Sequence, residues 1–144
     1  MKYLNSIVVV LALIVSLGAL QGCSTMADSG SREKVVMQVS DNDPAKWNLA
    51  LNNAKNVQQM IGADKTEIEI VVYGPGINML KMDSVVAGRI DEAKNANIKI
   101  VACENSVKSL KLTKDDMLPS TSYVPAGVVE LMKKQKEGYA YIRP

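Results

Sequence analysis

The sequence has no histidine and no phenylalanine, and it contains one tryptophan and two cysteines in 144 residues. Without histidine, the chain cannot form Ser-His-Asp or Cys-His nucleophilic sites, nor the usual histidine zinc sites. If one of the two cysteines bears a lipid, the single remaining thiol cannot hold an iron–sulfur cluster. The phosphate-binding patterns GxxxxGK[ST] and GxGxxG are also missing from the sequence. We therefore expect no metal and no cofactor, and a core built from aliphatic side chains.

The first 23 residues have the pattern of an export signal. Lys2 precedes an apolar run over residues 7–20, which is shorter than the roughly 20 residues that a membrane span needs. The segment LQGC at residues 20–23 resembles the lipobox of bacterial lipoproteins. That resemblance implies lipidation of Cys23 and cleavage before it. An ordinary cleaved signal or an uncleaved anchor is the alternative.

A lipid on Cys23 would anchor the protein to a membrane on the periplasmic side. Ser24 stands where an aspartate would signal retention in the inner membrane, so the outer membrane is favoured weakly. Residues 24–33 are small and polar, which is typical of a flexible tether. Residues 34–144 are enough for one domain with a modest core. Loss of Lys2 would leave 16 basic and 15 acidic residues, a balance that gives no general attraction for nucleic acid.

Strand and helix patterns alternate along residues 34–144. Apolar, β-branched runs predict strands at residues 34–39, 67–73, 98–102, 122–124 and 139–143. Amphipathic segments between them predict helices, and the first would be capped by Asp43, would begin at Pro44, and would end at Gly62. A further helix is expected to open at Pro125. This alternation predicts an α/β domain of three layers, with a mainly parallel sheet of about five strands and helices on both faces.

The residues with chemical potential gather after the expected strands. Ligands of open parallel sheets bind outside the carboxyl ends of the strands, so these loops should rim one crevice. For each loop alone, the need for turn residues is the preferred explanation. The candidate residues are Asp41, Asn42, Gly74, Gly76, Cys103, Glu104, Asn105 and Ser106.

Cys103 is the cysteine that would stay unlipidated, and it stands where a strand passes into a helix. A helix amino terminus favours negative charge and lowers the pKa of a thiol, whereas the neighbouring Glu104 disfavours the thiolate. The position alone is equally compatible with a buried, inert cysteine.

Four stretches together resemble the DsrE/DsrF-like family of small α/β proteins related to sulfur-relay subunits. They begin at Lys34, Glu67, Lys99 and Ser122, and the most specific pieces are ACENS at residues 102–106 and VPAGVVE at residues 124–130. The resemblance implies assembly as a trimer or hexamer. It also implies that Cys103 carries sulfur as a persulfide, which would need a sulfur donor and an acceptor thiol or protein. Ser106 stands where a threonine is common.

Two functions therefore remain open at this point. In the first, the protein carries sulfane sulfur on Cys103, which is covalent carriage and leaves enzymatic turnover undecided. In the second, it is a non-catalytic oligomeric module that binds a small ligand or a partner protein, with Cys103 in the wall of the site. Trp47 is expected to anchor the first helix to the sheet, and the lysine-rich residues 133–136 are expected to be a solvated helix end.

Overall fold

A computed structural model describes residues 32–144 of the chain, so the expected signal and Cys23 lie outside the described residues. Within that range, no helix has both the length and the apolar character needed to cross a membrane. The strands are β1 (Glu33–Val39), β2 (Thr66–Val72), β3 (Lys99–Cys103), β4 (Ser122–Val124) and β5 (Ala140–Ile142). The α-helices are α2 (Pro44–Ile61), α3 (Ala87–Asn95), α4 (Glu104–Ser109) and α5 (Gly127–Lys136), and two 3-10 helices are η1 (Gly74–Leu80) and η2 (Lys114–Asp116).

The five strands form one sheet in the order β4-β3-β2-β1-β5, and all four strand pairs are parallel. This confirms the predicted α/β fold. The strand boundaries differ slightly from those expected, since β1 already includes Glu33, which pairs with Thr66. Parallel strands covered on both faces are apolar along much of their length, as residues 70–72 of β2 and 100–103 of β3 are.

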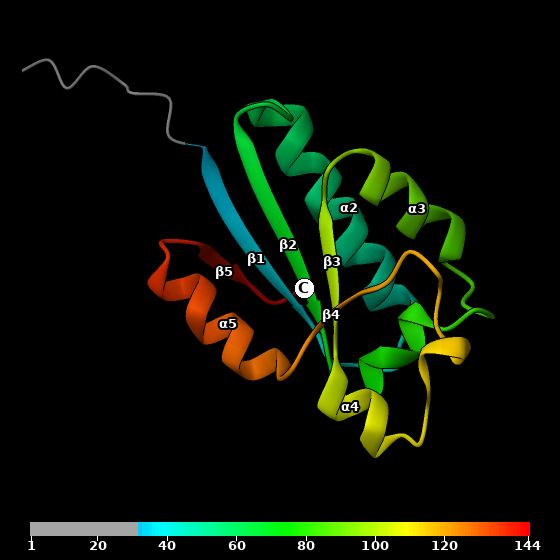
Figure 1. Cartoon of the computed structure of the whole chain (residues 1–144). Helices are drawn as coiled ribbons and strands as arrows, with labels where there is room; N and C mark the ends of the chain where they lie inside the picture. The colour runs from blue at the N-terminus through cyan, green and yellow to red at the C-terminus, as the bar shows by residue number, and fades with distance from the viewer. Residues whose placement is uncertain (1–31) are drawn as a thin grey trace, which may run out of the picture.

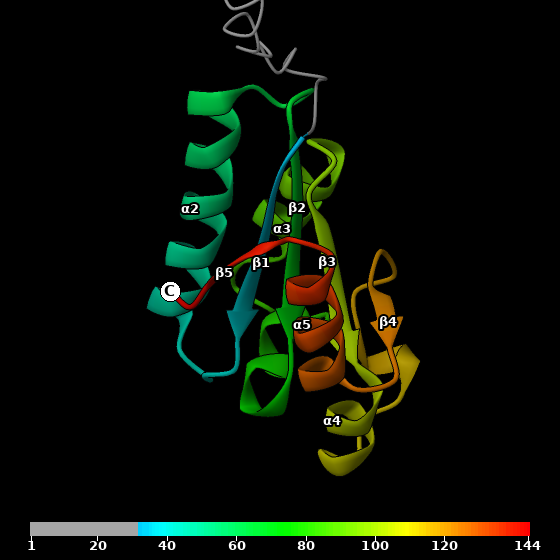
Figure 2. The ribbon, with the colours of Figure 1, turned by 90° about the vertical axis from the view of Figure 1, so that its left-hand side faces the viewer.

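The path of the chain decides which helix covers which face. From β1 to β4 each new strand is added on the same side of the last, and the chain then crosses from β4 to the far edge to form β5. Because such crossovers are right-handed, the reversal of direction places α5 on the opposite face from α2 and α3. Figure 1 shows this arrangement, and Figure 2 shows α5 crossing in front of the sheet while α4 lies beyond the carboxyl end of β3.

The amino end of α2 has the cap that the sequence predicts. The carboxylate of Asp43 accepts a 2.8 Å hydrogen bond from the amide of Ala45, and Pro44 occupies the first turn. Trp47 is buried, and its indole Nε1 donates to the backbone oxygen of Asp41 at 2.7 Å. The anchoring role expected for Trp47 is therefore confirmed, and it also ties α2 to the loop after β1.

The two faces of the sheet bury unequal cores. The face under α2 and α3 carries the large cluster, which also includes Val107 of α4. The face under α5 carries a small cluster centred on Leu131. Two expectations for α5 were wrong: it begins at Gly127 rather than Pro125, and Lys134 is buried rather than solvated. The residues facing the sheet from α5 are spaced by four and three, so the helical period turns Lys134 inward while Lys133 and Lys136 remain exposed.

Candidate functional site

Cys103 ends β3 and directly precedes α4, and 5% of its surface is exposed. It is a free cysteine. The groups that face its sulfur as hydrogen-bond donors come from two elements: the hydroxyl and amide of Ser106 and the amide of Asn105 in α4, and the amide of Gly127 in α5. As the N-cap residue of α4, Cys103 makes no side-chain capping hydrogen bond.

These donors lower the pKa of the Cys103 thiol and so favour its thiolate form. Burial raises the pKa of Cys103, but the hydrogen bonds from Ser106, Gly127 and Asn105 together outweigh it and leave the pKa below its ordinary value. The direction follows because donors stabilise the thiolate more than the thiol. A lower pKa increases the fraction of the nucleophilic form at neutral pH.

Glu104 has a different place from the one expected. It raises the pKa of the Tyr123 phenol, to which burial makes the larger contribution. The two residues line a hollow beside α4, together with Lys108, Lys114 and neighbouring apolar side chains. The causes that set the pKa of the Cys103 thiol are its burial and its four donor groups, and Glu104 is not one of them.

Ser106 links the site to the loop after β2. Its Oγ accepts a 2.8 Å hydrogen bond from the amide of Gly74, whose φ of +55° lies in the left-handed region that favours glycine. The same hydroxyl faces Cys103, so it accepts from the Gly74 backbone while donating to the sulfur. On the other side, the amide of Asn105 donates to the backbone oxygen of Pro125 at 3.3 Å, which ties the loop after β4 to α4.

Gly127 and Tyr73 complete the surroundings of the thiol, although neither is among the candidate residues that the sequence indicates. A Cβ on Gly127 would lie 2.9 Å from Cβ of Tyr73 and 3.3 Å from Cβ of Cys103. The pKa of the Tyr73 phenol is raised chiefly by burial and then by Tyr141. Close packing across Gly127 therefore brings the ends of β2, β3 and β4 to one point.

The loop after β1 supports this end of the sheet from farther away. The Asp41 carboxylate pairs with Lys46 at 3.1 Å and with Arg143 at 3.9 Å, and Asn42 is exposed. Gly76 lets the next loop approach, because a Cβ there would lie 2.7 Å from the backbone oxygen of Val39. Of the candidates, Asn105 and Ser106 thus face Cys103, and Gly74 is joined to it through Ser106, whereas Asp41 forms ion pairs with other residues and Glu104 lines the hollow beside Tyr123.

Two further observations concern ligands. Residues 32–144 contain no group of three or more acidic or thiol side chains placed to hold a metal ion. A hollow between α2 and α3 is lined by polar residues such as Asn52, Gln58 and Arg89. The hollow at Glu104 and Tyr123 is the one beside the Cys103 loops. Where the sequence predicts a common crevice, the loops after β2, β3 and β4 meet around the nearly buried thiol of Cys103.

Comparisons with known proteins agree with this architecture. The model of the DsrE/DsrF-like family matches residues 33–144. A protein of unknown function from Methanobacterium thermoautotrophicum has a similar structure, with a TM-score of 0.74 and 30% sequence identity over 78% of this chain and 99% of that one. A conserved protein of unknown function from Bacteroides thetaiotaomicron shares the fold at a TM-score of 0.64 and 16% identity, over 78% of this chain and 95% of that one. The search of curated proteins found no match.

Proposed function

The chain belongs to the DsrE/DsrF-like family, and from that premise we propose that it is an exported, lipid-anchored protein that carries sulfane sulfur as a persulfide on Cys103. One observation carries the proposal: the Cys103 thiol lies at the meeting point of three strand ends, where donors from α4 and α5 lower its pKa. A buried cysteine surrounded by apolar groups would have a raised pKa instead.

The transfer step is a thiol–disulfide type exchange. The Cys103 thiolate attacks the outer sulfur of a polysulfide or persulfide donor, and a new S–S bond forms as the S–S bond of the donor breaks. The donor leaves with the electron pair as a thiolate, so no oxidant or reductant is consumed. The persulfide then carries the negative charge on its outer sulfur, within reach of the amides of Ser106 and Gly127 that already face the thiol. Attack by an acceptor thiolate on the outer sulfur returns Cys103 to its starting state.

Mass spectrometry tests the carriage directly. After exposure to polysulfide, the peptide containing Cys103 should gain the mass of sulfur, and treatment with a reducing thiol should remove it. Cys103→Ser should keep the fold, because the change is small and the hydroxyl can still meet the same donors, but it should lose the loading. If wild-type Cys103 does not load, the same site is left with the non-catalytic binding function.

Self-association is part of the proposal. The outer surface of α5 exposes three apolar side chains, Val128, Val129 and Met132, which are 53%, 61% and 53% exposed. They begin one residue after Gly127, so a second copy packed there would lie beside the thiol. We expect a trimer or hexamer in sedimentation, and Val129→Lys should shift the protein toward monomer while Lys133→Glu, on the same helix, should not. A wild-type monomer at micromolar concentration would contradict this expectation.

Anchoring through Cys23 is tested separately. Labelled palmitate should enter the wild-type protein, and Cys23→Ala should abolish the label. Equal labelling of the two proteins would contradict a lipid anchor at this position. If only the wild type is labelled, separation of the inner and outer membranes would show in which of them the protein is anchored.

A further inference from the structure

Helix α5 rests on the sheet through one row of buried residues, Gly127, Leu131 and Lys134. Gly127 packs against Tyr73 and Cys103, and Leu131 joins the small apolar cluster on this face. Lys134 extends to Glu69, a carboxylate in the middle of β2. The helix therefore contacts the sulfur site at its first residue and an ion pair near its last turn.

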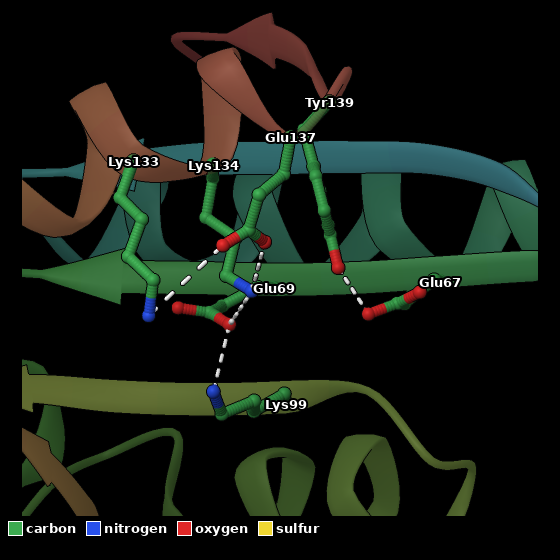
Figure 3. Close-up of polar contacts among 7 residues, drawn as sticks. All are labelled: Glu67, Glu69, Lys99, Lys133, Lys134, Glu137 and Tyr139. Atoms are coloured by element: carbon green, nitrogen blue, oxygen red, sulfur yellow. Dashed lines mark hydrogen bonds and ion pairs between the residues drawn. The ribbon is translucent and has the colours of Figure 1, made fainter.

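The ion pair is buried on both sides. Glu69 is 2% exposed, and its Oε2 lies 2.9 Å from Nζ of Lys99 and 3.7 Å from Nζ of Lys134. Lys134 also donates to Glu137 at 3.0 Å (Figure 3). The second oxygen of Glu69, Oε1, is buried and has no hydrogen-bond partner within the described part of the chain. The carboxylate is thus held by two lysines through one of its oxygens.

This arrangement constrains α5 because a buried charge without a partner is costly. Removing one partner of a buried pair typically destabilises a protein by about 3–5 kcal/mol. Any displacement of α5 that draws Lys134 away would leave Glu69 with Lys99, whose side chain is 55% exposed. The apolar cluster on this face is small, and the ion pair adds a second contact between α5 and the sheet.

The helix can transmit that constraint to the thiol. Gly127 and Lys134 are seven residues apart on a ten-residue helix, a span of about 10 Å at roughly 1.5 Å per residue. An α-helix of this length moves as a rigid body, so a shift at Lys134 changes the position of the Gly127 amide.

We propose that Glu69 and Lys134 are positioning residues for Cys103: their ion pair fixes α5 on the sheet and thereby holds the amide of Gly127 against the sulfur. The proposal deepens the proposed function and rests on it, since a positioned thiol has a use only if the thiol reacts. The charged or titratable groups around the two centres are Tyr73 beside the thiol and Glu104, which follows Cys103 in the chain, and Lys99, Glu137, Lys133 and Tyr139 around Glu69 and Lys134.

The test measures the reactivity of Cys103 in the full chain. Iodoacetamide is applied across a pH range, and alkylation is quantified in the peptide that contains Cys103, so that Cys23 does not contribute. Lys134→Met and Glu69→Gln should each raise the thiol pKa and slow alkylation at pH 7 roughly three- to tenfold, because one pKa unit changes the thiolate-to-thiol ratio about tenfold. Lys134→Arg should restore most of the wild-type profile.

The matched control is Lys133→Met on the same helix. The Lys133 side chain is 62% exposed and approaches Glu137 only at 4.0 Å, so its loss should leave the alkylation profile unchanged. An unchanged profile in folded Lys134→Met or Glu69→Gln protein would overturn the proposal. So would a failure of both variants to fold by circular dichroism, because the pair would then support the whole domain rather than position the thiol.

Sulfur loading of the wild-type protein tests sulfur carriage separately from the positioning role of Glu69 and Lys134. If wild-type Cys103 does not load from polysulfide, carriage fails even where the two variants shift the pKa. If it loads and the variants leave the pKa unchanged, carriage stands and the positioning role fails.

Discussion

Replacing Gly127 with alanine would place a methyl group between two side chains that must stay close for the site to exist. The new Cβ would lie 2.9 Å from Cβ of Tyr73, and 3.3 Å from both Cβ of Cys103 and Cδ1 of Tyr73. Carbon atoms prefer about 3.5–4.0 Å, so the first residue of α5 must retreat by about 0.6 Å or more from Tyr73. Because a Cβ cannot swing aside as a flexible side chain can, the backbone of α5 must move.

Opposing contributions set the expected stability change. Overpacking a close contact typically costs about 1–3 kcal/mol. Alanine in place of glycine in a helix returns at most about 1 kcal/mol, and less in the first turn. We therefore expect Gly127→Ala to lower the free energy of unfolding by about 1–2 kcal/mol. The same retreat withdraws one of the four donor groups at Cys103, so the thiol pKa should rise toward its ordinary value.

The assay combines thermal unfolding with the rate of iodoacetamide alkylation against pH. Gly88→Ala is the matched control, because Gly88 is exposed in α3 and a Cβ there meets nothing within 4 Å. That variant should gain up to about 1 kcal/mol of stability and leave the thiol unchanged. If Gly127→Ala is as stable as the wild type and has the same thiol pKa, the close contact of α5 with the sulfur does not control the site.

Three other perturbations have definite expected outcomes. Ser106→Ala should raise the pKa of the Cys103 thiol and slow its alkylation at pH 7, because a donor is lost, whereas Ser106→Thr should keep the wild-type profile. Glu104→Gln should lower the pKa of Tyr123 in a spectrophotometric titration with little effect on the thiol, and a large thiol shift would contradict the placement of Glu104. Burial, followed by a carboxylate hydrogen bond, raises the pKa of Tyr139 to about 12, so its contribution to stability should be complete below about pH 10 and should fall as the pH rises toward 12. Tyr139→Phe should reduce that fall in urea unfolding midpoints measured across this range, leaving the smaller contributions of Tyr73 and Tyr123, whose pKa values are also raised by burial.

The sequence predicts most of the fold because the fold depends on local patterns. The β-branched run at residues 67–73 and the capped start of the helix at Asp43 are each readable within a few residues, and the structure has both. Cys103 at the end of a strand is predictable for the same reason. Once strands and helices alternate, the parallel sheet follows from the need for crossover connections.

The surroundings of Cys103 depend on contacts between distant segments, which periodicity does not report. The close approach of Gly127 to Cys103, and the pairing of Lys134 with Glu69, join residues far apart in the chain. One signal was present for the ion pair: Glu69 lies between Ile68 and Ile70 in a strand expected to be buried, and a buried carboxylate requires a cationic partner. The partner, Lys134, lies in the lysine-rich run near the end of α5. To identify it from the sequence, one would need the helical period and also the face of α5 that packs on the sheet.

The order of the strands explains why the donors converge at Cys103. The chain leaves β3 through α4, which packs on the α2 and α3 side through Val107, and it leaves β4 through α5 on the opposite side. In open α/β sheets, the crevice forms between neighbouring strands whose connections leave toward opposite faces. β3 and β4 are such neighbours, so a residue that ends β3 can receive donors from the starts of both α4 and α5. A thiol at the end of β2 would lack this geometry, because the connections after β2 and β3 leave toward the same face.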